Sequence, residues 1–232
     1  MAFDSKTFQT RAITAIAFVI VMLTGLLWNG ISFTILFIII HFGCWYEFIK
    51  LLKLIRPSDY GKYLPLGLLY ITLPFLLLVL LGFPQAKPAF SQGVFLSEMK
   101  YLPVLPCGII FSIWINDTMA YIVGSLIGKT PLSKISPKKT LEGTIGGAIL
   151  CIITISLIGR AIGFFSLTDW IIIATCCAVF GTLGDLLESK LKRMAKVKDS
   201  GTFMPGHGGF LDRFDSLLIA SLSVGFYYYL LM

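Results

Sequence analysis

Residues 167–187 read LTDWIIIATCCAVFGTLGDLL, and residues 184–216 continue as GDLLESKLKRMAKVKDSGTFMPGHGGFLDRFDS. The first stretch is apolar and long enough to cross a lipid bilayer, which takes about 20 residues of helix. The second stretch carries eleven charged side chains and one His. Because charge at membrane depth is costly, acids and bases gathered at the end of a spanning helix indicate chemistry.

Apolar runs of this kind recur along the whole chain. The 232 residues are 56% hydrophobic and 13% charged, and the mean hydropathy is +0.87. Only helices and closed barrels can cross lipid, and runs this long exclude the short alternating strands of a barrel. The sequence therefore predicts an all-α polytopic membrane bundle with about seven transmembrane helices, forming a single domain over residues 1–232. The seven predicted spans are 12–29, 31–52, 63–82, 102–127, 143–164, 167–187 and 214–231.

The basic residues fall mainly on one side of these spans. With the N-terminus in the cytoplasm, sixteen Lys and Arg lie on the inner side, and three (Lys87, Lys100 and Arg160) lie outside. This asymmetry follows the positive-inside rule. The net charge of +7 then reflects topology and contact with anionic lipid, and we expect no nucleic-acid partner. We expect a bacterial-type inner or plasma membrane protein, with the N-terminus and active site cytoplasmic and the C-terminus outside.

Two of the first four predicted spans contain an acidic residue. Asp117 follows Asn116 within 102–127, and an Asp in a span normally faces the bundle interior or a wet cavity. That position favours a functional role over a packing contact. The segment 45–47 reads WYE near the inner end of 31–52. Because aromatic residues gather at membrane interfaces, we interpret this segment as an interfacial anchor.

A basic loop precedes the fifth span. Residues 136–143 read SPKKTLEG, so Lys138 and Lys139 lie beside the predicted helix start and Glu142 falls in its first turn. Helix N-termini and cationic side chains both attract phosphate, which makes this loop a candidate phosphate site. The following glycines, in GTIGG at 143–147, provide small residues for close helix contact.

Candidate metal ligands lie at the inner end of the sixth span. Asp185 and Ser189 are four residues apart and share a helix face, with Lys192 about one turn further along. Hard oxygen ligands suit Mg²⁺, which usually keeps waters and binds one or two carboxylates plus substrate phosphates. Glu188 lies on a neighbouring face, and we interpret it as solvated charge at the helix end.

The segment 205–215, PGHGGFLDRFD, combines a flexible turn with a second group of acids. Its glycines permit unusual backbone dihedrals, and successive N–H groups in such a loop can form an anion-binding nest. Asp212 and Asp215 are three residues apart and can face one way. A metal shared with Asp185 would relieve the repulsion between these acids. His207 is either chemical or structural.

Together these motifs resemble the signature of phosphatidate cytidylyltransferases, also called CDP-diacylglycerol synthases. The spacing of the signature is intact over 27 residues, and the segments 136–143 and 116–117 also resemble the family. The similar elements cover roughly the C-terminal half, about 102–232. The signature residues are Ser189-x-Leu191-Lys192-Arg193, Lys198-Asp199-x-Gly201 and Pro205-x-His207-Gly208-Gly209-x-x-Asp212-Arg213-x-Asp215.

The resemblance implies a nucleotidyltransferase that converts CTP and phosphatidate into CDP-diacylglycerol and pyrophosphate with Mg²⁺, and the number of metal ions, one or two, stays open. It also implies a homodimer within membrane lipid. The expected catalytic residues are Asp185, Lys192, Arg193, Asp212, Arg213 and Asp215. The expected substrate-binding residues are Asn116, Asp117, Lys138, Lys139, Glu142, Lys198, Asp199, His207, Gly208 and Gly209. The expected metal ligands are Asp185, Ser189 and Asp212.

Two alternatives remain open from the sequence. A CTP-dependent polyprenol or phytol kinase would use similar cationic clamps, but it needs a base for an alcohol and carries a different motif. A membrane transporter would account for Asp117 and for the interrupted span 102–127. Such a protein should have paired broken helices in two related halves, and no such repeat is visible in the sequence.

Overall fold

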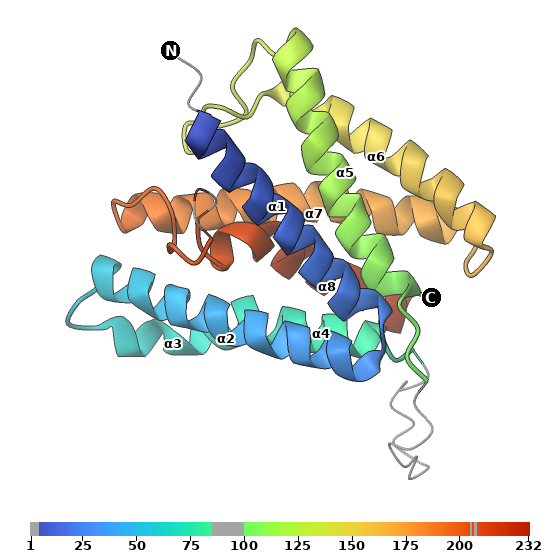
Figure 1. Cartoon of the computed structure of the whole chain (residues 1–232), viewed down its shortest axis with the longest axis horizontal. Coiled ribbons are helices and arrows are strands. Elements are labelled where there is room, and N and C mark those ends of the chain that lie inside the picture. Colours follow the sequence, from blue (N-terminus) through green and yellow to red (C-terminus); the bar gives the residue numbers. More distant parts are fainter. Residues whose placement is uncertain (1–4, 85–99, 205, 207) are drawn as a thin grey trace.

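The computed structural model describes residues 5–84, 100–204, 206 and 208–232, with side chains from residue 12 onward, and these residues form a bundle of helices (Figure 1). Within them no strand forms, and the only bridges are two isolated pairs. All seven predicted spans coincide with helical segments. The long helices are α1 (Ser5–Leu27), α2 (Gly30–Ile55), α5 (Val104–Ile127), α6 (Leu141–Ile162), α7 (Leu167–Met194) and α8 (Leu211–Leu230).

The third predicted span is a composite of short helices. It consists of η1 (Tyr60–Tyr63), α3 (Leu64–Gly67), η2 (Leu68–Thr72) and α4 (Leu73–Leu81), and η2 is a π-helical turn. Pro74 is the second residue of α4 and has no N–H to donate to the turn before it. The missing donor favours a wider π turn at this point, because an α-helical hydrogen bond cannot form there.

Helix α7 lies at the centre of the bundle. It packs against α5, α6 and α8, and α8 also contacts α2 and α4. Helix α1 crosses the α7–α8 pair between α2 and α5 (Figure 1). The ring of Phe18 in α1 contacts Trp114 of α5 and Phe214 of α8, with centroids 6.5 and 5.9 Å apart.

Glycines allow two of these helix pairs to approach closely. A Cβ atom at Gly147 would lie 2.6 Å from the backbone N of Ala120, so α5 and α6 meet where the GTIGG segment predicts close contact. A Cβ atom at Gly184 would overlap the backbone of Asp215. The α7–α8 contact therefore brings Asp185 of one helix beside Asp215 of the next.

The length and composition of the helices fit a membrane protein. Five of them are long and apolar enough to cross a bilayer: α2, the segment Tyr60–Leu81, α5, α6 and α7. In α1 the apolar part with described side chains, Ala12–Leu27, is shorter, and α8 is not among the five. Large apolar side chains such as Ile38 and Phe42 are exposed, as expected on a lipid-facing surface. The prediction of an all-α polytopic bundle in a membrane is confirmed.

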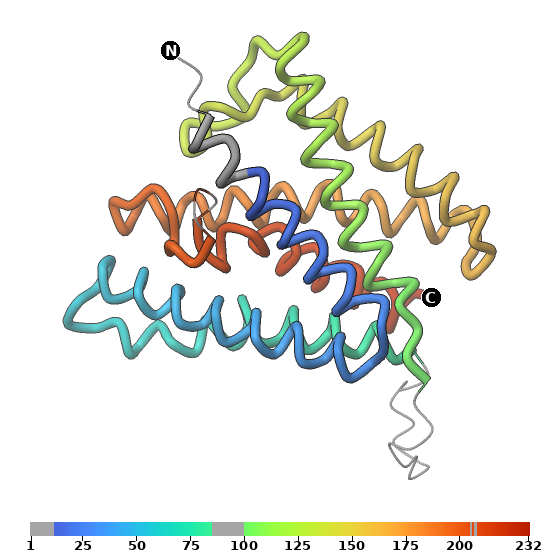
Figure 2. Tube along the Cα trace, in the orientation of Figure 1, coloured from blue at the N-terminus to red at the C-terminus, as the bar shows by residue number. Residues whose placement is uncertain are grey.

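The polar loops gather at one end of this bundle. Helix α1 begins, α5 ends and α6 begins on the same side as the end of α7, while α8 ends on the opposite side (Figure 1). The connection between α7 and α8 folds back beside the end of α7 before α8 begins (Figure 2). The charged segment 184–216 therefore lies at the loop end that also contains residues 128–140.

Candidate active site

A polar cavity of about 180 Å³ opens where α1, α5, α7 and α8 meet. Its apolar wall comes from α1, α5 and α8, and its polar lining comes from α5, α7 and the first turns of α8. Asp185 and Asp212 line the same cavity, as the hypothesis of a shared site requires. The polar lining residues are Asp117, Asp185, Asp212, Arg213 and Asp215.

A second cavity, of about 480 Å³, shares Asp117 and Asp185 with the first and is also lined by Asn116, Lys138 and Lys139. Lys139 Nζ lies 2.7 Å from Asp185 Oδ2. Burial lowers the pKa of Lys139, but the attraction of Asp185 outweighs it and leaves the pKa raised. The predicted phosphate loop and the predicted metal ligand of α7 are thus in direct contact.

Asp212 accepts hydrogen bonds on both carboxylate oxygens. Lys192 Nζ donates to Oδ1 at 2.6 Å, while Ser200 N, Ser200 Oγ and Gly209 N each donate to Oδ2 at 2.8 Å. Burial raises the pKa of Asp212, but these donors, Lys192 foremost, lower it to about 2. Gly208 has φ +85°, and a Cβ atom there would lie 2.6 Å from Asp212 Oδ2. Gly208 and Gly209 therefore allow the loop to pack closely against the Asp212 carboxylate.

Lys192 joins two acids from different helices. Its ammonium pairs with Glu188 in α7 and with Asp212 in α8. The side chain of Glu188 is 0% exposed, so its interpretation as solvated charge at a helix end is wrong. The helix packs that face against the bundle instead of leaving it in water. A buried carboxylate of this kind needs a cation nearby, and Lys192 provides it.

Glu47 of α2 is a polar residue of this region that the sequence analysis missed. It is 3% exposed, and it accepts hydrogen bonds from Ser200 Oγ at 2.7 Å and from Phe210 N and Leu211 N at 2.9 Å. The interpretation of residues 45–47 as an interfacial anchor is therefore wrong for Glu47. The signal was present, because an acid inside an apolar span is a candidate site residue by the reasoning applied to Asp117.

The carboxylate groups that line the polar cavity are the type of ligand that a hard divalent cation binds. Four carboxylates and one arginine line it, and carboxylate oxygens are the protein ligands that Mg²⁺ takes. In the part of the chain that the structure describes, no three His, Cys, Asp or Glu residues converge on one point as a metal cage. The donor set therefore fits a cation held by one or two carboxylates and completed by water and substrate phosphate.

Two predicted site residues contact their own loops. Glu142 accepts hydrogen bonds from Lys129 N at 3.1 Å and from Thr130 N at 3.2 Å, and so ties the start of α6 to the preceding turn. Arg193 Nη1 donates to Val197 O at 3.2 Å on the exposed side of the loop after α7. Neither residue lines the two polar cavities.

The remaining predicted residues are divided between surface and interior. Ser189 is buried and lines neither polar cavity. Lys198 and Asp199 are exposed in the connection between α7 and α8. His207 lies outside the described residues. Their roles stay predictions.

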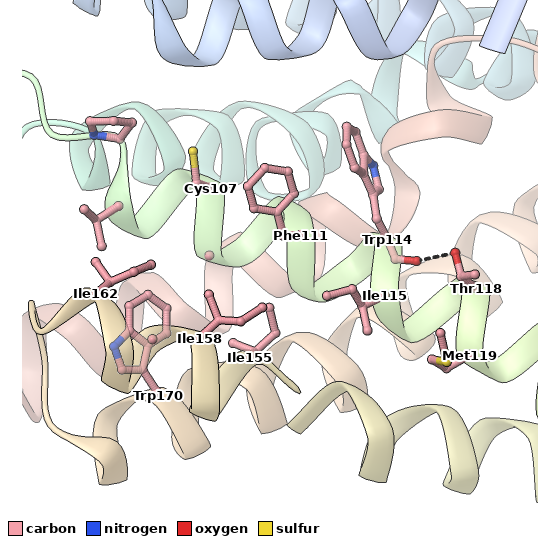
Figure 3. A pocket seen from close by; sticks show the side chains of 14 residues that line it. Cys107, Phe111, Trp114, Ile115, Thr118, Met119, Ile155, Ile158, Ile162 and Trp170 are labelled. Atoms are coloured by element: carbon pink, nitrogen blue, oxygen red, sulfur yellow. Dashed lines mark hydrogen bonds between the residues drawn. The ribbon is translucent and has the colours of Figure 1, made fainter. Parts of the chain in front are cut away.

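Two apolar cavities adjoin the polar one. The first, of about 470 Å³, is lined by α5, by α6 and by the start of α7: Phe111 and Trp114 come from α5, Ile158 from α6 and Trp170 from α7 (Figure 3). It shares Trp114 with the polar cavity. The second, of about 340 Å³, lies between α1, α2 and the segment 203–214. It shares four residues with the polar cavity, namely Phe18, Met22, Arg213 and Phe214.

Comparison with known proteins agrees with the motifs. A family model described as the cytidylyltransferase family matches residues 104–232. Proteins called phosphatidate cytidylyltransferase from Staphylococcus saprophyticus, Staphylococcus haemolyticus and Staphylococcus aureus are 48%, 47% and 46% identical to the chain over 109 residues. The matched segment is 46% of this chain and 42% of each relative, so it spans less than half the length of these relatives.

Proposed function

Since the chain belongs to the cytidylyltransferase family, we propose that it is a phosphatidate cytidylyltransferase, which makes CDP-diacylglycerol and pyrophosphate from CTP and phosphatidate. The observation that carries this proposal is the shared cavity of Asp185 and Asp212. Cationic groups surround it, and apolar cavities open beside it. A site that joins a polyanionic nucleotide to a lipid headgroup needs carboxylates for a metal ion, cationic groups for the phosphates and apolar space for the acyl chains.

The reaction is an attack of a phosphatidate oxygen on the α-phosphorus of CTP. The new P–O bond forms as the bond to the β-phosphate oxygen breaks, and pyrophosphate leaves with that electron pair. The second pKa of a phosphate monoester is near 6, so the nucleophile is largely ionised at neutral pH. The chain therefore needs no strong general base, and its main task is to bring two anions together.

Basic residues of the larger polar cavity are suited to hold the nucleotide. Lys138 and Lys139 line it beside Thr140, which caps α6 by accepting a hydrogen bond from Gly143 N. Cations next to a helix N-terminus bind phosphate well. Mg²⁺ held by Asp185 and Asp212 would neutralise charge on the transferred phosphate and the leaving pyrophosphate. Asp117 and Asp215 would orient the ligands around it.

Arg213 is suited to bind the lipid phosphate. It lines both the polar cavity and the apolar cavity between α1 and α2. A lipid headgroup at Arg213 would meet the acids on one side, while an acyl chain follows the apolar wall on the other. The cavity between α5 and α6 reaches the same place through Trp114 and offers a path for the second chain.

The topology that fits this chemistry has the loop end in the cytoplasm, where CTP is present. Most Lys and Arg residues lie in the loops of that end or in the helix ends beside them, as the positive-inside rule requires, and α8 then ends outside. From the family resemblance we also propose a homodimer, with membrane lipid and no nucleic acid as partners. Cysteine cross-linking in native membranes tests the dimer.

Transfer of radiolabel tests the reaction directly. Purified protein in detergent receives phosphatidate, Mg²⁺ and CTP labelled in either the α- or the γ-phosphate. Label from the α-phosphate in the lipid phase supports cytidylyl transfer. Label from the γ-phosphate alone would identify a lipid kinase instead, and no label in lipid from either position would overturn both enzymatic assignments.

A further inference from the structure

Glu47 of α2 lies outside the matched residues 104–232, yet its carboxylate contacts the loop that carries the signature. Phe210 N donates to Oε1 and Leu211 N donates to Oε2, both at 2.9 Å. Ser200 Oγ donates to Oε2 at 2.7 Å. One buried side chain from the N-terminal half therefore accepts three hydrogen bonds from the end of the α7–α8 connection and the first residue of α8.

These contacts place Glu47 at the N-terminus of α8. The first N–H groups of a helix lack partners within the helix, and a carboxylate there is also stabilised by the helix dipole. The residue before α8, Phe210, makes no side-chain cap. We propose that Glu47 is a positioning residue that caps α8 from a neighbouring helix and thereby holds Asp212 and Arg213 in the candidate site.

The surrounding glycines fit this role. A Cβ atom at Gly201 or Gly209 would overlap the Glu47 carboxylate, so the loop can close on it only without side chains there. Gly43 lies one turn before Glu47 on the same face of α2, and a Cβ atom at Gly43 would overlap the ring of Phe210. The face of α2 is thus shaped to receive both the ring and the backbone at the start of α8.

Ser200 transmits the position of Glu47 to Asp212. Its hydroxyl oxygen is 2.7 Å from Glu47 Oε2 and 2.8 Å from Asp212 Oδ2, so one hydrogen is shared between two carboxylates. Its backbone N also donates to Asp212 at 2.8 Å. Loss of the Glu47 acceptors would free this loop and change how Asp212 faces Lys192 and the polar cavity.

The test compares Glu47→Gln with Glu47→Asp. Glutamine has the same size as glutamate, so the substitution has little effect if Glu47 only fills space. If Glu47 is a clamp, the substitution disrupts it, because the amide NH₂ would face a backbone N–H. We expect Glu47→Gln to lower kcat at least tenfold, to raise the Mg²⁺ concentration for half-maximal rate, and to change the KM for phosphatidate less than twofold. Glu47→Asp keeps two acceptors and should retain more activity than the glutamine variant.

Thr72→Val is the matched control. Thr72 Oγ1 is 3.0 Å from His41 Nε2 and 2.9 Å from Trp45 Nε1, so it joins α2 to η2 without touching the loop before α8. This variant removes polar contacts of the same helix, and we expect its kcat and Mg²⁺ dependence to match those of the wild type. Ser200→Ala removes the shared hydroxyl and should change both values in the same direction as Glu47→Gln.

Hydrogen exchange gives a second readout that needs no catalysis. This role of Glu47 rests on the proposed function only for its kinetic readout. Amides of residues 199–204 and 208–212 should exchange faster in Glu47→Gln than in the wild type or Thr72→Val. Faster exchange in Glu47→Gln, together with a wild type that transfers no cytidylyl group, would support the clamp and refute the proposed function. An active wild type whose Glu47→Gln variant keeps its kcat and exchange rates would overturn the clamp alone.

Discussion

Lys139 Nζ lies 2.7 Å from Asp185 Oδ2, so an ion pair joins the loop before α6 to helix α7. Both residues line the larger polar cavity, and Asp185 also lines the smaller one. This pair is the point at which a candidate phosphate ligand and a candidate metal ligand meet. An incoming triphosphate with its cation can exchange partners with both groups.

Lys139→Ala should lower kcat/KM for CTP by about 10²-fold, the usual cost of removing one electrostatic contact to a reacting group. The substitution removes a cation from the cavity and leaves Asp185 without its partner. Steady-state rates with varied CTP measure the effect. Lys134→Ala, an exposed lysine of the same loop, makes the same change in charge and should remain at the wild-type rate. Equal rates for the two variants would exclude a role for Lys139.

Asp212→Asn should abolish turnover, with a loss of at least about 10²-fold in kcat, while expression and folding persist. The amide has the shape of the carboxylate but lacks its charge toward Lys192 and a cation. The measurement is α-label transfer into lipid, with thermal unfolding as the check on folding. Near-normal activity in this variant would remove Asp212 from the metal site.

The pH dependence of stability should also identify Asp212. Its pKa is lowered to about 2 in the folded protein, so its stabilising contribution is complete above the ordinary pKa of about 4 for Asp. That contribution disappears as the pH falls through the folded value. The unfolding temperatures of the wild type and Asp212→Asn should therefore differ by a constant amount from pH 5 to 8 and converge only under stronger acid. Convergence near neutral pH would contradict this assignment.

Lys192→Met should destabilise the fold by about 3–5 kcal/mol, because it leaves the buried Glu188 without a cation. Denaturation in mixed micelles measures the free energy of unfolding. The double variant Lys192→Met with Glu188→Gln removes the uncompensated charge and should recover part of the loss. If the double variant is less stable than Lys192→Met, the unpaired charge of Glu188 is not the cause of the destabilisation.

Most of the fold is predictable from hydropathy. Each of the seven apolar runs becomes a helical segment, since lipid leaves the backbone few alternatives. The break of the third segment into η1, α3, η2 and α4 is harder to predict. Prolines such as Pro74 are visible in the sequence, but whether a turn widens or kinks depends on the neighbours that accept the free carbonyl groups.

The site was predictable where the motif has local spacing. Asp185, Asp212 and Arg213 belong to one continuous segment, and they line one cavity. Glu47 and Glu188 were misinterpreted because their burial depends on contacts between distant parts of the chain. Sequence periodicity assigns a residue to a helix face, but burial of that face follows from the packing of α2 and α7 against α8.

Chelation should stop cytidylyl transfer, and Mg²⁺ should restore it. The polar cavity holds four carboxylates against one arginine, so a divalent cation has charge to neutralise even before substrate binds. A cation that binds only the folded state raises stability by mass action, so Mg²⁺ should also raise the unfolding temperature of the wild type. Asp185→Asn should reduce that rise, whereas Asp59→Asn, which alters an exposed pair with Lys62, should not. A transfer rate indifferent to EDTA would mean that Lys139 and Arg213 neutralise the phosphates without metal.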